Sequence, residues 1–379
     1  MKKIKIVFVV HQLLCGGAEQ ALFDLLCLMD KSKFDITLIA TNDGGEWEEK
    51  FKDAGFEPIY MFYKRQKKDP VSFVKHQWRK ISLRWLLKQN PRKYISTVMP
   101  DGADIVVSYS IWVFEEMALA YNTKHVRFMH GNVESNDIFR RNMTNRSHLF
   151  PEFDKIICVS RESCEAFQRV FGLQDKVEMH FNPMNSENVC RLAAQTPDVP
   201  TDLPYICAVG RLAEEKGYDR LIRIHRRLLD QGLKHRLVIV GDGPEKKNLM
   251  QTVQETGTQD TVILAGYQSN PYSYMKNSRF LVCSSFTEGL PVIAMEALCL
   301  GIPIVSAVPS IAEVFGEECC GIVTENDDDS LACGIRKMLE DQAFYETAKH
   351  GAENRSAFFD GKRMVRELED LFIDLMEGK

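Results

Sequence analysis

The sequence predicts an α/β protein of two domains, each built on a parallel β-sheet covered by helices. Three observations predict this class. Short runs rich in Val and Ile alternate with helical stretches, as in parallel sheets that are buried on both faces. The pattern stops near the middle of the chain and then restarts. The length of 379 residues, with 45% hydrophobic and 27% charged residues, suits two globular domains of ordinary size.

Each half of the chain contains its own set of predicted strands. The first set is Ile4–Val10, Asp35–Ala40, Pro58–Met61, Ile105–Ser108, His125–Met129 and Lys155–Val159. The second set is Tyr205–Val209, Arg236–Val240, Val262–Ala265, Phe280–Cys283 and Ile304–Ser306. The helical stretches between them are long enough to cross from one parallel strand to the next.

The segment 184–204 is the predicted linker between an N-terminal domain, 1–183, and a C-terminal domain, 205–357. It is rich in Pro, Asn, Thr and Asp, and its prolines interrupt regular structure. The last segment, 358–379, is a predicted helix with an apolar stripe. The stripe consists of Met364, Val365, Leu368, Leu371, Phe372 and Leu375.

The composition limits where in the cell the protein is expected and which kinds of site it is expected to contain. No apolar run is as long as a membrane span, and the apolar start of the chain is too short to be a secretory signal. The eleven cysteines have no disulfide-like spacing and the nine histidines form no metal-binding cluster. We therefore expect a cytoplasmic protein with reduced thiols, no metal site and no nucleic-acid partner.

Residues 64–93 are strongly basic, with eleven Lys and Arg and one acidic residue. Val74, Trp78, Ile81 and Trp85 recur within them at helical spacing. A basic amphipathic helix with tryptophan on its apolar side suits an anionic membrane surface, so we predict that this segment docks there. Alternatively, the stripe packs on the domain core, and the charges are solvated or bind an acidic polymer.

The most informative motif is Phe-Thr-Glu-Gly-Leu-Pro, in which Glu288 precedes Glu296 by eight residues. Gly289 and Pro291 are expected to turn the chain into a helix, with the N–H groups of Leu290 and its neighbours left to bind an anion. Carboxylates accept hydrogen bonds from hydroxyls. A diphosphate with sugar hydroxyls on both sides is a nucleotide-sugar. A chance Glu before an amphipathic helix is the alternative.

This E-x7-E arrangement resembles the donor-site signature of the retaining glycosyltransferases of family 4. The resemblance implies the GT-B fold, in which two Rossmann-like domains have parallel sheets that face a central cleft. It implies that Glu296 binds the ribose and that Glu288 binds the donor sugar. It also implies that the last helix crosses back onto the N-terminal domain.

Arg211 and Lys216 follow the first strand of the second half, where ligands bind open parallel sheets. Arg offers a planar fork to a phosphate and Lys a point charge. Both match the diphosphate clamp of the family that the motif resembles. The alternative is that they pair with Glu214 or Glu215 on the surface.

Several glycines follow predicted strands and match loops of the same family. Gly241 and Gly243 match a donor-side loop, although a plain turn explains them nearly as well. Gly266 and Tyr267 resemble the loop that holds the nucleobase. In the first half, Gly16 and Gly17 resemble the loop that approaches donor phosphate and acceptor, with a tight turn as the alternative. They do not form the G-x-G-x-x-G dinucleotide fingerprint.

His130 directly follows the strand His125–Met129, which puts it in the expected cleft. Family members carry a His here that contacts the transferred sugar and supports positive charge at its anomeric carbon. A buried structural His is the alternative. Relatives commonly have Glu before this His, whereas this chain has Met129.

The predicted function is a retaining, hexosyltransferase-type glycosyltransferase in cell-envelope polysaccharide assembly. Its donor is a nucleoside-diphosphate sugar, most simply a UDP-sugar, and its acceptor is a glycan, lipid-linked or polymeric. We expect no cofactor, because the acidic run Asp327–Asp329 precedes a helix and suits a solvated cap. We expect it to be peripheral on the inner face of the membrane. The alternatives are a sugar-nucleotide epimerase of similar fold and a non-catalytic glycan-binding partner.

Overall fold

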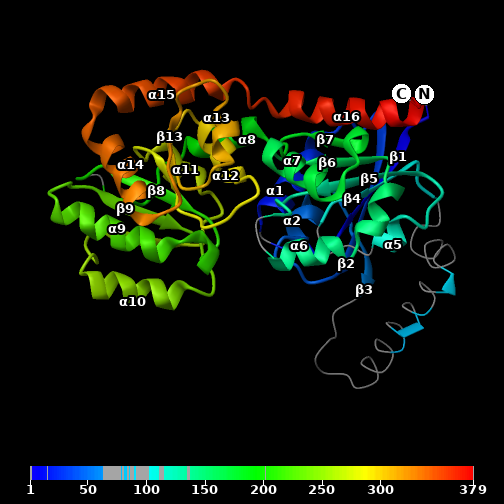
Figure 1. Ribbon diagram of the computed structural model, residues 1–379, viewed down its shortest axis with the longest axis horizontal. Coiled ribbons are helices and arrows are strands. Elements are labelled where there is room, and N and C mark those ends of the chain that lie inside the picture. The colour runs from blue at the N-terminus through cyan, green and yellow to red at the C-terminus, as the bar shows by residue number, and fades with distance from the viewer. Residues whose placement is uncertain are drawn as a thin grey trace. The chain divides into compact units, whose positions relative to one another are not determined.

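The computed structural model describes residues 2–14, 16–62, 102–110, 115–134, 137–200 and 202–378, and also residues 78, 81, 82, 85, 89 and 90. The chain forms two compact units (Figure 1). Unit 1 comprises residues 1–183 and 362–379, and unit 2 comprises residues 184–361.

Unit 1 contains a seven-stranded parallel sheet with the order β3-β2-β1-β4-β5-β6-β7. The strands are β1 Ile4–Val10, β2 Phe34–Asn42, β3 Ile59–Phe62, β4 Ile105–Ser108, β5 Lys124–Met129, β6 Lys155–Cys158 and β7 Val177–Met179. Its helices are α1 Gly17–Leu28, α2 Glu48–Asp53, α5 Glu115–Ala118, α6 Asp137–Thr144, α7 Arg161–Phe171 and α16 Gly361–Glu377. Short 3₁₀ helices span Ser147–Glu152 and Gln174–Lys176.

Unit 2 contains a six-stranded parallel sheet with the order β10-β9-β8-β11-β12-β13. The strands are β8 Tyr205–Val209, β9 Arg236–Val240, β10 Val262–Gly266, β11 Leu281–Cys283, β12 Ile304–Ser306 and β13 Gly321–Val323. The helices are α8 Ser186–Ala193, α9 Tyr218–Asp230, α10 Lys246–Thr256, α11 Tyr272–Lys276, α12 Val292–Cys299, α13 Ile311–Phe315, α14 Asp328–Glu340 and α15 Gln342–Ser356, with a 3₁₀ helix at Glu214–Lys216.

The predicted fold class is confirmed, because both halves form parallel sheets of the Rossmann type. All eleven predicted strands are present, within two residues at either end. The sequence did not predict β7 and β13, which have three residues each and lie at the edges of their sheets. Runs this short give too little pattern to recognise.

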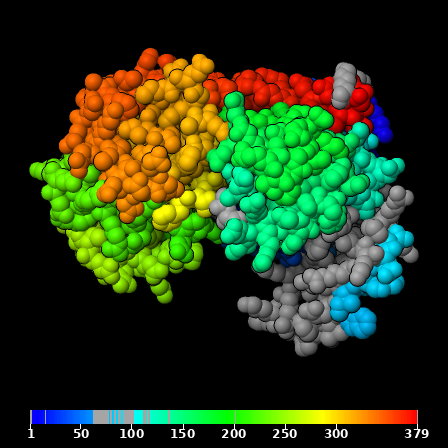
Figure 2. All heavy atoms as spheres, viewed as in Figure 1, coloured from blue at the N-terminus to red at the C-terminus, as the bar shows by residue number. Residues whose placement is uncertain are grey.

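Helix α16 packs on the core of unit 1 although it is the last helix of the chain. Val365, Leu368, Leu371, Phe372 and Leu375 are buried in one cluster with residues of β1, β2 and α1. The Phe372 ring lies 6.4 Å from the rings of both Phe8 and Phe34. Figure 2 shows the outer side of α16, in red, at the surface of unit 1. The last helix is therefore part of the core of the first domain.

The predicted linker 184–204 instead contains helix α8, and it belongs to unit 2. Asn185 caps this helix by accepting a hydrogen bond from the Asn188 N–H at 3.0 Å, and Val189 and Ala193 are buried. The stretch between Pro183 and Pro197 is long enough for two helical turns. The prediction of a plain linker was therefore wrong for these residues.

A pair of histidines is buried in unit 2. His225 of α9 and His235 before β9 are joined between Nδ1 and Nε2 at 2.9 Å, and each side chain is at most 1% exposed. His235 Nδ1 donates to the Leu233 carbonyl at 2.9 Å, so its Nε2 accepts from His225. The Thr261 hydroxyl completes the chain at His225 Nε2. Burial lowers the pKa of both rings, which favours the neutral form that this chain of hydrogen bonds requires.

Most of the basic segment 64–93, including Val74, lies outside the described residues. Trp78, Ile81 and Trp85 are described, are helical and are 70%, 61% and 64% exposed. Among the helices that the structure describes, none is both long and apolar enough to cross a membrane.

Candidate active site

The donor-side residues predicted from sequence lie on two loops at the carboxyl end of the second sheet. One loop follows β8 and the other follows β11, and these strands are neighbours in the sheet. The Phe286 N–H donates to the Glu215 carbonyl at 2.8 Å, and Ser284 Oγ donates to the Lys216 carbonyl at 2.9 Å. The two loops therefore form one hydrogen-bonded unit.

Gly217 makes this close approach possible. Its φ is +64°, and a Cβ at this position would lie 2.3 Å from the Ser284 carbonyl oxygen. A side chain there would therefore separate the loops as well as strain the backbone.

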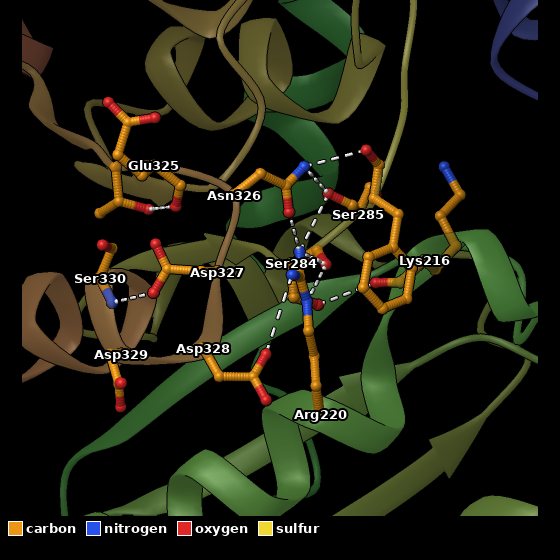
Figure 3. Close-up of polar contacts among 12 residues, drawn as sticks. Lys216, Arg220, Ser284, Ser285, Glu325, Asn326, Asp327, Asp328, Asp329 and Ser330 are labelled. Atoms are coloured by element: carbon orange, nitrogen blue, oxygen red, sulfur yellow. Dashed lines mark hydrogen bonds and ion pairs between the residues drawn. The ribbon is translucent and has the colours of Figure 1, made fainter. Parts of the chain in front are cut away.

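The structure brings Lys216 and Glu288 together. The Lys216 ammonium contacts Glu288 Oε1, and their side chains are 25% and 18% exposed. Ser285 Oγ also donates to Glu288 Oε1, at 2.8 Å. A cation and a carboxylate assigned to adjacent parts of one ligand thus lie side by side. Figure 3 shows Lys216 and Ser285, which both contact Glu288.

Arg211 lies on the same loop as Lys216 but has a different partner. Its side chain is 64% exposed, and its Nη2 lies 3.0 Å from Glu215 Oε1. This is the surface pair that the sequence offered as an alternative. Exposed pairs of this kind contribute about 0–1 kcal/mol, so Arg211 is able to exchange Glu215 for a phosphate at little cost.

Helix α12 begins at Val292, and Pro291 is its N-cap. The Ala294 N–H donates to the Pro291 carbonyl at 3.0 Å. The amides before Ala294 precede the first intrahelical bond, as at every helix N-terminus. The Leu290 side chain is 6% exposed, so it anchors the loop in the core while its backbone lies at the helix start.

Glu296 is only 6% exposed and lies in the second turn of α12. Its Oε1 accepts a hydrogen bond from the Tyr272 hydroxyl of α11 at 2.9 Å. The sequence did not identify Tyr272. Nothing in a single tyrosine after Asn270 and Pro271 indicates a contact with a helix twenty residues further along the chain.

The donor-side glycines lie where backbone meets backbone. A Cβ on Gly241 would lie 1.9 Å from the Gly210 carbonyl oxygen, and one on Gly243 would lie 2.4 Å from that of Leu212. Gly266 has φ +70° and accepts a hydrogen bond from the Gly241 N–H at 2.9 Å. These contacts pack the loops after β8, β9 and β10 together. Tyr267, beside Gly266, is 58% exposed.

In unit 1, His130 follows β5 and packs between two aromatic rings. Its ring centroid lies 4.5 Å from that of Tyr109 and 5.8 Å from that of Phe128. Both imidazole nitrogens are buried, and neither makes a hydrogen bond within the part of the chain that the structure describes. Burial, with the charge of Arg127, lowers the pKa of His130 to about 4. The polar groups of the Tyr109 backbone and the Asn182 side chain offset part of that shift. The imidazole is therefore neutral at pH 7.

Gly17 is the first residue of α1, and Gly16 is its N-cap. Gly16 makes room for Glu19, because a Cβ at residue 16 would lie 2.6 Å from Glu19 Oε2. The loop after β1 is braced by the loop after β2, since the Trp47 N–H donates to the Leu13 carbonyl at 3.0 Å. Asp327, in the acidic run, caps α14 by accepting from the Ser330 N–H at 2.8 Å.

Two protein-family models match the chain, one on each half. Residues 15–188 match the model described as Glycosyltransferase Family 4, and residues 193–355 match the model described as Glycosyl transferases group 1. The matches support a GT-B glycosyltransferase.

Two curated relatives match most of this chain. A Campylobacter jejuni protein named N-acetylgalactosamine-N,N'-diacetylbacillosaminyl-diphospho-undecaprenol 4-alpha-N-acetylgalactosaminyltransferase is 27% identical over 96% of this chain and 98% of its own. The lipopolysaccharide core biosynthesis glycosyltransferase LpsD of Rhizobium meliloti is 26% identical over 78% of this chain and 82% of its own. The relatives thus include enzymes of envelope polysaccharide and lipid-linked glycan synthesis.

The fold matches solved glycosyltransferase structures. The Anabaena protein HepE, in complex with UDP, has a TM-score of 0.76 over 98% of this chain and 100% of its own, at 16% sequence identity. At that identity the likeness establishes the fold alone.

Proposed function

We propose that this glycosyltransferase moves a hexose-type sugar from a UDP-sugar to a lipid-linked glycan, with retention of configuration at the anomeric carbon. The observation that carries the proposal is the cluster at the start of α12. There Lys216 and Glu288 lie on two loops that are joined by hydrogen bonds, and Glu296 lies in the second turn of the helix that follows. Cations and free amides suit a diphosphate, and carboxylates suit the hydroxyls on either side of it.

Each donor-side group has one role in this proposal. Arg211 and Lys216, with the amides of Gly289 and Leu290, hold the diphosphate. Glu296 accepts from the ribose hydroxyls, Glu288 accepts from hydroxyls of the donor sugar, and the loops with Gly241, Gly243, Gly266 and Tyr267 hold the rest of the nucleotide. Arg211 and Lys216 are paired with carboxylates, and a diphosphate can replace those carboxylates as the partner of both cations.

Donor and acceptor are inferred from the comparisons. The structure with a TM-score of 0.76 contains UDP, and a further structure of the same protein contains UDP-glucose. The Campylobacter jejuni relative is named for a diphospho-undecaprenol acceptor. A lipid-linked acceptor implies work at the inner face of the membrane, which agrees with the basic segment 64–93.

The proposed reaction is a front-face substitution at the anomeric carbon. The bond from that carbon to the diphosphate oxygen breaks, the acceptor oxygen attacks from the same face, and the leaving diphosphate oxygen takes the acceptor proton. Arg211, Lys216 and the start of α12 stabilise the departing charge. In this proposal His130 supports the positive charge that develops at the anomeric carbon, and its neutral imidazole adds no charge of the same sign.

The first test is a screen of UDP-sugars, with other nucleotide-sugars as controls, for stabilisation against thermal unfolding. A ligand at a hundred times its Kd adds about 2.7 kcal/mol to the free energy of unfolding. The best donor is then incubated with lipid-linked acceptors, and NMR of the product reports the anomeric configuration. Retention supports the proposal, and inversion contradicts the reaction course.

Two outcomes would replace the proposal with another function. Conversion of the nucleotide-sugar to its epimer without acceptor would indicate an epimerase. Tight binding of the nucleotide-sugar, with neither transfer to an acceptor nor hydrolysis of the donor, would indicate a non-catalytic glycan-binding partner.

A further inference from the structure

Arg220 lies under the loop that carries Glu288. It is in the first turn of α9, and only 6% of its side chain is exposed. Its Nε and Nη2 donate to the Ser284 carbonyl at 2.9 and 2.5 Å. Nη2 also donates to the Ser285 carbonyl at 3.1 Å and to Asn326 Oδ1 at 2.8 Å. Figure 3 shows the guanidinium at the centre of these contacts.

Asn326, which precedes α14, completes the arrangement from the other side. Its Nδ2 donates to the Ser285 carbonyl at 3.3 Å and to the Phe286 carbonyl at 2.9 Å. Three successive carbonyls, those of residues 284, 285 and 286, thus receive side-chain donors. The Phe286 ring lies 4.2 Å above the Arg220 guanidinium carbon, which adds a cation–π contact.

The fixed loop determines where Glu288 lies. Ser285, whose carbonyl is held by Arg220 and Asn326, uses its hydroxyl to bind Glu288 Oε1. Ser284, whose carbonyl is held by Arg220, uses its hydroxyl to bind the Lys216 carbonyl. Arg220 is therefore linked by one residue to each member of the Lys216–Glu288 pair.

We propose that Arg220, with Asn326, is a positioning residue that holds Glu288 in the geometry needed for sugar transfer. The role assigned to Glu288 rests on the proposed function, whereas the hold on the loop does not. Arg suits this task because its planar fork reaches two carbonyls and an amide oxygen at once, which a Lys ammonium on a flexible stem does not. The guanidinium is turned toward backbone and acts through the loop, without touching the donor.

The first test measures the loop without substrate. Arg220→Gln, Arg220→Lys and Asn326→Ala are compared with wild type by amide hydrogen exchange. The Phe286 N–H, bonded to the Glu215 carbonyl, should exchange at least tenfold faster in both Arg220 variants and severalfold faster in Asn326→Ala. Arg223→Gln is the matched control, because Arg223 lies on the same helix, is 52% exposed and pairs with Asp219. Unchanged exchange in all three variants would overturn the proposal.

The second test is a double-mutant cycle on transfer, with the donor found in the screen. Arg220→Lys should lower kcat at least tenfold while the Kd for UDP, measured by calorimetry, changes less than threefold. In a Glu288→Gln background the same change should have little further effect on kcat, because it acts through Glu288. Independent, multiplicative losses would show a merely structural role. If Arg220→Gln does not fold, Arg220→Lys and Asn326→Ala still decide the question.

The two tests separate this inference from the proposed function. If no nucleotide-sugar supports transfer by wild type, the proposed function fails, and the exchange measurement alone judges whether Arg220 holds the loop. If wild type transfers sugar but the Arg220 variants keep normal exchange and kcat, the inference fails and the proposed function stands.

Discussion

Replacing Lys216 by Met removes its charge and keeps most of its length, so it isolates the electrostatic part of the proposed diphosphate clamp. Losing one donor to charge that develops in a transition state costs about 2.7–4 kcal/mol. Wild type gives up part of this, because its ammonium must leave or share Glu288. The side chains of Lys216 and Glu288 are 25% and 18% exposed, and ion pairs that water can reach contribute about 0–1 kcal/mol. The net loss should be roughly 2–3 kcal/mol, or about thirty- to 150-fold in kcat/KM.

Steady-state kinetics with the identified donor measure this loss, and circular dichroism checks the fold. Arg211→Ala should produce a similar decrease, since Arg211 gives up only its exposed contact with Glu215. Arg226→Ala is the matched control, because Arg226 forms the same kind of exposed i,i+4 pair, with Asp230, on the far part of α9. The control should keep kcat/KM within twofold. If Lys216→Met and Arg211→Ala are equally active, the clamp is wrong.

Four further predictions follow from the site and the core. Glu296→Ala should weaken UDP binding at least tenfold in calorimetry, whereas Glu288→Ala should chiefly lower kcat; equal weakening of UDP binding would refute this division. Transfer should persist in excess chelator, and abolition with rescue by Mg²⁺ or Mn²⁺ would contradict that. The full chain should float with anionic but not neutral vesicles, less so after charge reversal within 64–93; no binding at low salt removes the claim. Burial lowers the pKa of His225 to about 3 and also lowers the pKa of His235. The unfolded chain therefore binds protons that the folded domain does not, and the free energy of unfolding should fall below about pH 6.5, by up to about 1.4 kcal/mol per pH unit for each histidine. Urea unfolding at pH 7 and 5 measures it, and equal stability at both would count against neutral buried rings.

The fold was predictable because buried parallel strands leave a strong local signal. Ile4–Val10 is apolar except for Lys5, and Tyr205–Val209 is apolar throughout, which is typical of strands covered on both faces. Helix α8 was missed for the opposite reason. Only Val189 and Ala193 are buried among its eight residues, so its apolar pattern is too thin to stand out among prolines and polar residues.

Within the candidate site, the sequence indicated only the residues that stand in a motif of fixed spacing. Glu288 and Glu296 are marked by the turn and helix between them. The contacts that hold them are not, since Arg220 and Asn326 lie 106 residues apart and meet only after the sheet has formed. Parallel topology brings the loops of β8, β11 and β13 to one edge. No local pattern records which side chain will then face which carbonyl.

The two units hold their key groups by different means. On the donor side, main-chain and side-chain hydrogen bonds lock the loop after β11, and the charged groups already have partners of opposite sign. In unit 1, His130 is held by the rings of Tyr109 and Phe128, and its buried nitrogens lack hydrogen bonds to the described residues. The proposed binding of a diphosphate requires a rigid loop whose charged groups can exchange their present partners for phosphate. In the proposed function a sugar hydroxyl would supply the partner that the His130 nitrogens lack, because an unpaired buried nitrogen costs about 1–3 kcal/mol until it finds a partner.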